Sequence, residues 1–375
     1  MQKLGNFSWL TAGRARMASL AIVLTAVFSL SACYDKFTLS SPDIGPDGVI
    51  KNAQVYNSFG CTGNNQSPRL VWKNAPDAAK SFVVTMYDPD APTGSGFWHW
   101  TVLDLPGSTI SLGSNAGAAG NAGLPAGALQ GYTDYGTSAY GGPCPPVGDK
   151  PHHYVFTVYA MNIASTGLTA GAPGALVSFV AKANSIASAS FTATFGRAGP
   201  PTTAYVPNTP TGFTLSSTEI PANSTIGNNQ VYNGFGCAGG NISPSLGWSG
   251  VPAGAQSLVL TMYDHDAPTG SGFWHWLVFN IPPAASSIAL GAGVLNSTTL
   301  PTGAGQGYTD FGASAYGGPC PPAGDKPHHY IFTLYALSIP DVTAVVGPNP
   351  SGSLLGFVTL ATATAQTSFT ATYGR

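Results

Sequence analysis

The stretch MYDPDAPTGSGFWHW, residues 86–100, decides the organisation of this chain, because MYDHDAPTGSGFWHW returns at residues 262–276. The two copies differ at one position. Near the two ends, SFTATFGR at residues 190–197 returns as SFTATYGR at residues 368–375. A repeat of this length predicts two duplicated domains rather than a solenoid of short units.

The duplication divides the chain into segments. Between the two copies, the run AGPPTTAYVPNTPTG is rich in proline and uncharged, which is typical of a semi-stiff linker. We therefore expect a first repeat at residues 34–197, a linker at 198–212 and a second repeat at 213–375, preceded by an export signal at 1–33.

Charge is scarce along the whole chain. The 375 residues include 13 Lys and Arg and 15 Asp and Glu, so 7% are charged and the net charge is -2. A typical soluble domain is about 25% charged. Few cations exclude an extended nucleic-acid surface, which needs clustered Lys and Arg. The apolar fraction of 43% is sufficient for packed cores.

The first 33 residues have the pattern of an export signal. Residues 1–16 carry three cations and no acid, and the uncharged run 17–32 is shorter than the roughly 20 residues of a membrane span. The run ends in Leu-Ser-Ala-Cys33, which resembles the lipobox of bacterial lipoproteins. We expect lipid at Cys33 to anchor the protein to a membrane of the bacterial cell envelope without spanning it. The alternative is a plain signal peptide cleaved nearby, with Cys33 a spare thiol.

Hydrophobic patterning predicts an all-β fold. Runs of β-branched and aromatic residues bounded by turn residues predict strands. A helix is expected only near residues 175–189 and, less clearly, near 353–366. The expected strands cover residues 81–87, 98–105 and 153–160, and again 258–263, 274–281 and 330–336.

Four cysteines besides Cys33 occupy matched positions, two in each repeat. In an exported chain this favours the disulfides Cys61–Cys144 and Cys237–Cys320, because each repeat must close its own bridge. The alternative is four buried free thiols. No C-x-x-C spacing supports a thiolate metal site.

The retained histidines and aspartates are the candidates for chemistry. Asp88 ends one expected strand, His99 lies within the next and His152 begins a third, so neighbouring strands would bring them to one end of a sheet. For Asp149 and Asp325, each beside a lysine, we favour ordinary turn chemistry. An aromatic rim for an apolar ligand group is expected from Phe97, Trp98 and Tyr140.

Three boxes, each present twice, resemble those of the phosphatidylethanolamine-binding protein family, in particular its bacterial Raf-kinase-inhibitor-like branch. They are the Asp-Pro-Asp-Ala-Pro box, which reads Asp-His-Asp-Ala-Pro in the second copy, the Trp-His-Trp strand and Gly-Pro-x-Pro-Pro-x-Gly-x-x-x-His-x-Tyr. The resemblance implies, in each repeat, a large antiparallel sheet packed on a smaller one. It also implies a pocket for phosphate or a phosphoryl headgroup. Carried over, the ligand-binding residues are Asp88, Pro92, His99, Cys144, Pro146, His152 and Tyr154, and Asp264, Pro268, His275, Cys320, Pro322, His328 and Tyr330.

Two departures from the family pattern are expected to matter. His153 and His329 stand where the family often has arginine, which would weaken an ion pair with Asp90 or Asp266. In addition, His265 replaces the proline of the first Asp-Pro-Asp box, which would loosen that turn and alter the second pocket.

The sequence favours a binding module over an enzyme, with no cofactor and no nucleic-acid partner. No G-x-S-x-G elbow or P-loop is present. Inhibition of a protease stays open, as does a surface lipoprotein with vestigial pockets. The rival class is a metal-dependent enzyme in which His99, His152 and Asp88 form a 2-His-1-carboxylate site.

Overall fold

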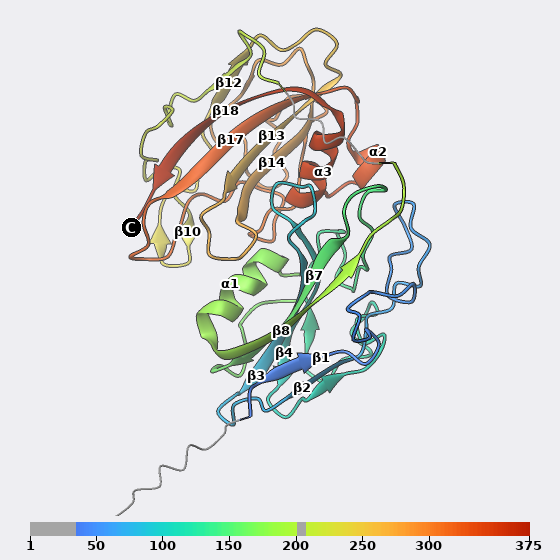
Figure 1. Cartoon of the computed structure of the whole chain (residues 1–375). Helices are drawn as coiled ribbons and strands as arrows, with labels where there is room; N and C mark the ends of the chain where they lie inside the picture. The colour runs from blue at the N-terminus through green and yellow to red at the C-terminus, as the bar shows by residue number, and fades with distance from the viewer. Residues whose placement is uncertain (1–34, 201–207) are drawn as a thin grey trace, which may run out of the picture. The chain divides into compact units, whose positions relative to one another are not determined.

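The computed structural model describes residues 35–200 and 208–375. The expected export signal with Cys33, and residues 201–207 of the expected linker, therefore lie outside the described residues. Lys36–Arg375 forms one compact unit that contains both repeats (Figure 1). None of the helices in the described ranges has the length and hydropathy that a membrane span requires.

The first repeat is built from two antiparallel sheets and one helix. The larger sheet has the order β6-β4-β3-β7-β8, and the smaller has the order β1-β2-β5. The larger sheet consists of β3 (Ser81–Asp88), β4 (Phe97–Pro106), β6 (Leu129–Gln130), β7 (His152–Met161) and β8 (Ser185–Phe195). The smaller sheet consists of β1 (Thr38–Ser40), β2 (Leu70–Lys73) and β5 (Ser111–Leu112), and the helix is α1 (Gly174–Asn184).

The second repeat follows the same plan, with sheets β16-β14-β13-β17-β18 and β15-β12-β9. It adds a short ribbon, β10 (Asn233–Gly234) with β11 (Cys237–Ala238), and a one-turn helix, α2 (Thr343–Val346). Its other elements are β9 (Thr214–Ser216), β12 (Leu246–Ser249), β13 (Ser257–Asp264), β14 (Phe273–Ile281), β15 (Ser287–Ile288), β16 (Gly305–Gln306), β17 (His328–Leu337), α3 (Gly352–Thr362) and β18 (Ala363–Tyr373). The expected fold, mainly β with a large sheet on a smaller one in each repeat, is confirmed.

Both faces of the large sheet are covered, and the apolar side chains of its central strand, β3, point alternately to one face and the other. In β3, Phe82 and Val84 point to the core between the two sheets, where Trp72 of β2 packs. Val83 points the other way and packs with Val177 of helix α1. Because successive strand residues face opposite sides, a strand that is covered on both faces has a nearly uninterrupted apolar sequence.

Both expected helices form, but they end earlier than predicted. Helix α1 ends at Asn184 and α3 at Thr362, and strands β8 and β18 begin at the next residue. The prediction was wrong over residues 185–189, because these residues pair with β7 from Met161 to Val158 and β8 continues this pairing to Phe195. Small alternating Ser and Ala residues accept either conformation, so the neighbouring strand decides.

The two repeats contact each other through reciprocal hydrogen bonds. The Trp98 indole N–H donates to the Ser271 hydroxyl at 3.0 Å, and the Trp274 indole N–H donates to the Ser95 hydroxyl at 3.0 Å. Such an exchange of matched residues is the signature of a twofold interface. The rim assignment of Trp98 was therefore wrong: this side chain is buried between the repeats.

A buried carboxylate supports the same interface. Asp134 accepts hydrogen bonds from the backbone N–H of Trp98 at 2.7 Å and from the hydroxyl of Ser353 at 2.9 Å. Burial raises the pKa of Asp134 to about 6, although these hydrogen bonds oppose the shift. Asp310, its counterpart, accepts from the Trp274 backbone N–H at 2.8 Å. Asp134 and Asp310 stand at matched positions of the two repeats, and the interface, not the pockets, explains why both are present.

Candidate functional site

Three adjacent strands carry the candidate residues to one end of each large sheet. Asp88 is the last residue of β3, His99 is the third of β4 and His152 is the first of β7, and β3 lies between the other two strands. The convergence predicted from the sequence is therefore present. The second repeat places Asp264, His275 and His328 in the same way.

The Asp88 carboxylate is fully engaged and buried. Its Oδ1 accepts the backbone N–H groups of Asp90 at 2.8 Å and Ala91 at 3.1 Å. Its Oδ2 lies 2.8 Å from Nδ1 of His152, which donates to it, and 4.0 Å from Nε2 of His99. In the second repeat, Nδ1 of His328 lies 2.7 Å from Oδ2 of Asp264.

The pKa values of the two histidines in the first pocket are shifted in opposite directions. His99 is tied through Nδ1 to the carbonyl oxygen of Gly141 at 2.7 Å, and burial lowers its pKa even though Asp88 acts to raise it. Burial also acts to lower the pKa of His152, but the hydrogen bond and charge of Asp88, with Asp149, outweigh it and raise that pKa. At neutral pH, His152 is thus the more readily protonated of the two.

A second carboxylate approaches the histidine from the loop before β7. Oδ2 of Asp149 lies 3.6 Å from Nε2 of His152, and Oδ2 of Asp325 lies 3.6 Å from Nε2 of His328. The interpretation of these aspartates as turn formers alone was therefore incomplete. Their recurrence in a charge-poor chain was the signal that pointed to this role.

A tyrosine hydroxyl in each pocket lacks a well-formed hydrogen bond. The hydroxyl groups of Tyr154 and Tyr330 are buried, and each lies near an aspartate, Asp88 or Asp264, without a contact of good hydrogen-bond geometry in the described structure. Burial raises the pKa of Tyr154, and the charge of Asp88 raises it further. A buried hydroxyl without a partner is costly, so each pocket presents a donor to whatever enters it.

The first pocket is a cavity of about 330 Å³. All seven residues predicted for it line it: Asp88, Pro92, His99, Cys144, Pro146, His152 and Tyr154. Of the expected aromatic rim, Phe97 lines the cavity, whereas Tyr140 lies in the core with its hydroxyl donating to the Gln54 carbonyl. Sequence reasoning missed Phe59, Tyr135 and Arg197, which also line it.

Arg197 brings a permanent cation to the wall of the first pocket. Its guanidinium donates to the carbonyl oxygens of Pro145 at 3.2 Å and Gly60 at 2.8 Å, which fixes its position. It closes the segment SFTATFGR, whose recurrence was noted in the sequence without a role for its last residue.

The second pocket has the matched predicted residues but a smaller cavity volume, about 50 Å³. It is lined by all seven residues predicted for it: Asp264, Pro268, His275, Cys320, Pro322, His328 and Tyr330. As at His99, burial lowers the pKa of His275, against the opposing effect of Asp264. Phe311 occupies the place of Tyr135.

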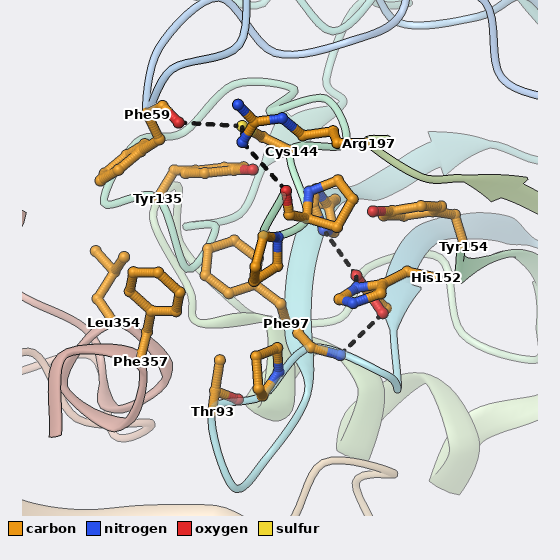
Figure 2. Close-up of a pocket in the computed structure, with 16 residues that line it drawn as sticks. Phe59, Thr93, Phe97, Tyr135, Cys144, His152, Tyr154, Arg197, Leu354 and Phe357 are labelled. Carbon is orange, nitrogen blue, oxygen red and sulfur yellow. Dashed lines mark hydrogen bonds and ion pairs between the residues drawn. The ribbon is translucent and has the colours of Figure 1, made fainter. Parts of the chain in front are cut away.

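Each pocket is completed by the helix of the other repeat. Leu354 and Phe357 of α3 line the first pocket, and Leu176 and Phe179 of α1 line the second. Figure 2 shows Leu354 and Phe357 across the cavity from His152 and Tyr154. Gly356 lets α3 approach, since a Cβ there would overlap the Thr93 carbonyl oxygen.

Both expected disulfides are present and support the pocket walls. Cys61 is bonded to Cys144 and Cys237 to Cys320, and each bridge spans 83 residues of sequence with 6.0 Å between the Cα atoms. Because Cys144 and Cys320 line the cavities, each bridge fixes one wall.

The two departures from the family pattern leave the local contacts in place, although the second pocket is smaller than the first. Nδ1 of His153 lies 2.7 Å from Oδ2 of Asp90, so an imidazole keeps the expected pair with the carboxylate. The turn that contains His265 keeps its two hydrogen bonds to Asp264, from Asp266 at 2.9 Å and Ala267 at 3.1 Å. The turn is therefore not loosened in its hydrogen bonds, whereas the expected difference between the two pockets is present.

Two β repeats, each with a small pocket that ends at a buried Asp–His pair, define the class of the molecule. The chain belongs to the phosphatidylethanolamine-binding protein family, whose model matches residues 40–196 and 216–374.

Relatives match one repeat at a time. UPF0098 protein YbcL of Escherichia coli is 48% identical over 161 residues, which are 43% of this chain and 87% of YbcL. UPF0098 protein YbhB of the same organism is 46% identical over 157 residues, 42% of this chain and 98% of YbhB. The crystal structure of E. coli YbcL, described as a new member of the mammalian family, covers 44% of this chain and 99% of that one at a TM-score of 0.42.

Proposed function

We propose that this chain is an exported, non-enzymatic binding protein, anchored by lipid at Cys33, whose pockets bind small phosphoryl anions. The observation that carries the proposal is the recurrence, in both pockets, of two buried histidines beside an aspartate and an unpartnered tyrosine hydroxyl. Imidazolium and phenol groups donate hydrogen bonds to phosphate oxygens. The two disulfides support export, because such bridges persist in oxidising compartments.

Charge in the first pocket favours an anion. Asp88 is already saturated by two backbone N–H groups and His152, so its negative charge is largely compensated. With the charges of Asp88 and protonated His152 offsetting each other, Arg197 supplies positive charge at the wall. A phosphoryl group would take its hydrogen bonds from protonated imidazole and from the Tyr154 hydroxyl.

Size and lining separate the two pockets. The first, at about 330 Å³, is in the range of small-molecule sites and has an apolar wall that includes Phe59, Phe97 and Phe357. We infer that it takes a phosphoryl headgroup with an attached apolar group. The second, at about 50 Å³, has room for the anion alone.

We expect glycerophosphoethanolamine to bind the full-length chain at least tenfold more tightly at about pH 5.5 than at about pH 8. Affinity falls as pH rises through the raised pKa of His152, because the cation that attracts the phosphoryl group is lost. Calorimetric titration at both pH values checks this. A diester is the right probe because the charge of inorganic phosphate itself changes near neutral pH.

A second test uses the double variant Tyr154→Phe/Tyr330→Phe, which removes both hydroxyls and keeps the rings. A severalfold loss of affinity is expected, because each removes one donor. Equal affinity at the two pH values, or no binding at either, contradicts the proposed function.

A further inference from the structure

Two histidines and an aspartate gather on the surface of the second repeat, among residues that do not line its pocket. Within the described parts of the chain, His265, Asp266 and His329 are the one group of three metal-ligating side chains whose ligand atoms all lie within 4.8 Å of one another. The rival metal reading of His99, His152 and Asp88 does not meet this geometry.

One carboxylate holds both rings of this cluster. Oδ1 of Asp266 lies 3.2 Å from Nδ1 of His265, and Oδ2 lies 2.8 Å from Nδ1 of His329. The backbone N–H of His329 also donates to Oδ2 at 2.8 Å, which fixes the carboxylate. The two imidazoles lie nearly parallel, 7° apart, with centroids separated by 5.8 Å.

We propose that His265, Asp266 and His329 bind a divalent transition metal of the Zn²⁺ class. Two imidazole nitrogens and one carboxylate oxygen are a recurrent donor set for such ions, with water in the remaining position. Ligand atoms around a tetrahedral zinc ion stand about 3.4 Å apart, so a pair at the upper limit of 4.8 Å would close by about 1.4 Å. All three are exposed, which leaves them room for this movement and an open path for the ion.

The first repeat shows what the site requires. His153 and Asp90 keep the same pair there, with Nδ1 of His153 and its backbone N–H both on Oδ2 of Asp90 at 2.7 Å. Pro89 stands where the second repeat has His265, so the third ligand is absent. The chain therefore contains one complete site and one matched site that lacks a single ligand.

A bound ion would join the two segments that carry the second pocket. His265 follows Asp264 at the end of β13, and His329 follows His328 at the start of β17. Asp264 and His328 both line the second pocket, whereas the next residue on each segment faces solvent. The metal would thus clamp the turn after β13 to β17 in the second repeat. In the first repeat, Pro89 stiffens the matched turn instead.

The test is calorimetric titration of Zn²⁺ into the full-length chain, purified without a polyhistidine tag. We expect one zinc ion per chain, at least tenfold weaker binding for His265→Pro, and a second site of similar affinity for Pro89→His. Each substitution installs the residue that the matched turn already holds, so both variants are expected to fold. His329→Gln, which leaves the turn intact, is the second loss variant.

Three results would overturn the proposal. They are a wild-type chain that binds no zinc, a His265→Pro variant that keeps the affinity, and a Pro89→His variant that gains no site. Retention of zinc by His265→Pro and its loss on His99→Ala would assign the ion to the first pocket instead. The outcome is independent of phosphoryl binding, because no residue of the cluster lines a pocket.

Discussion

Replacing Cys61 and Cys144 by serine is expected to lower the free energy of unfolding by about 3–5 kcal/mol. The bridge spans 83 residues, so its loss frees a long loop in the unfolded chain. It also releases the wall that Cys144 contributes to the first pocket. Calorimetric unfolding of the full-length chain, compared with the wild type, measures the loss.

The second repeat supplies the matched control. Serine at Cys237 and Cys320 removes a bridge of the same span, and we expect a similar loss of stability. Only the first pair of substitutions, however, is expected to weaken binding of an apolar phosphoryl ligand, because the larger pocket lies there. A change below about 1 kcal/mol for both pairs contradicts the structural role given to the bridges.

Phe357→Ala is expected to weaken binding of a short-chain phosphatidylethanolamine by roughly tenfold, which is about 1.4 kcal/mol. The half-buried ring belongs to helix α3 of the second repeat but lines the pocket of the first. Removing it takes away apolar surface that the acyl chains would cover, worth about 1.5–3 kcal/mol for a fully buried side chain. Glycerophosphoethanolamine, which has no acyl chain, should lose less than about twofold.

Phe179→Ala is the control for this prediction. Phe179 has the matched position on α1 and lines the smaller second pocket. We expect it to leave short-chain lipid binding unchanged, since that pocket has no room for the chains. Equal losses for both variants, or equal losses for both ligands, would show that α3 does not form an apolar subsite.

The fold and the polar part of the site could be predicted from the sequence, because both depend on local patterns that occur once in each repeat. Strand runs ending at Asp88 and beginning at His152 placed these residues at one sheet end, and the structure brings them together. The matched cysteines likewise pointed to the two bridges that form.

The apolar wall of the first pocket could not be predicted from the sequence, because it depends on how the two repeats pack against each other. No local pattern marks Phe357 as part of a pocket whose residues from the first repeat lie more than 150 positions earlier in the chain. Trp98 was misplaced for the same reason: its partner, Ser271, belongs to the other repeat. The helix ends were misjudged because pairing with β7, and not local propensity, determines the conformation after Asn184.

The central claim is that buried histidines at matched positions bind phosphoryl anions. Calorimetric titration of glycerophosphoethanolamine at about pH 5.5 into the His152→Ala/His328→Ala double variant tests it most directly. Each ring donates one Nδ1 hydrogen bond to a buried aspartate, so circular dichroism first confirms that the variant is folded. We predict at least a tenfold loss of affinity relative to the wild type. An unchanged affinity would contradict the account.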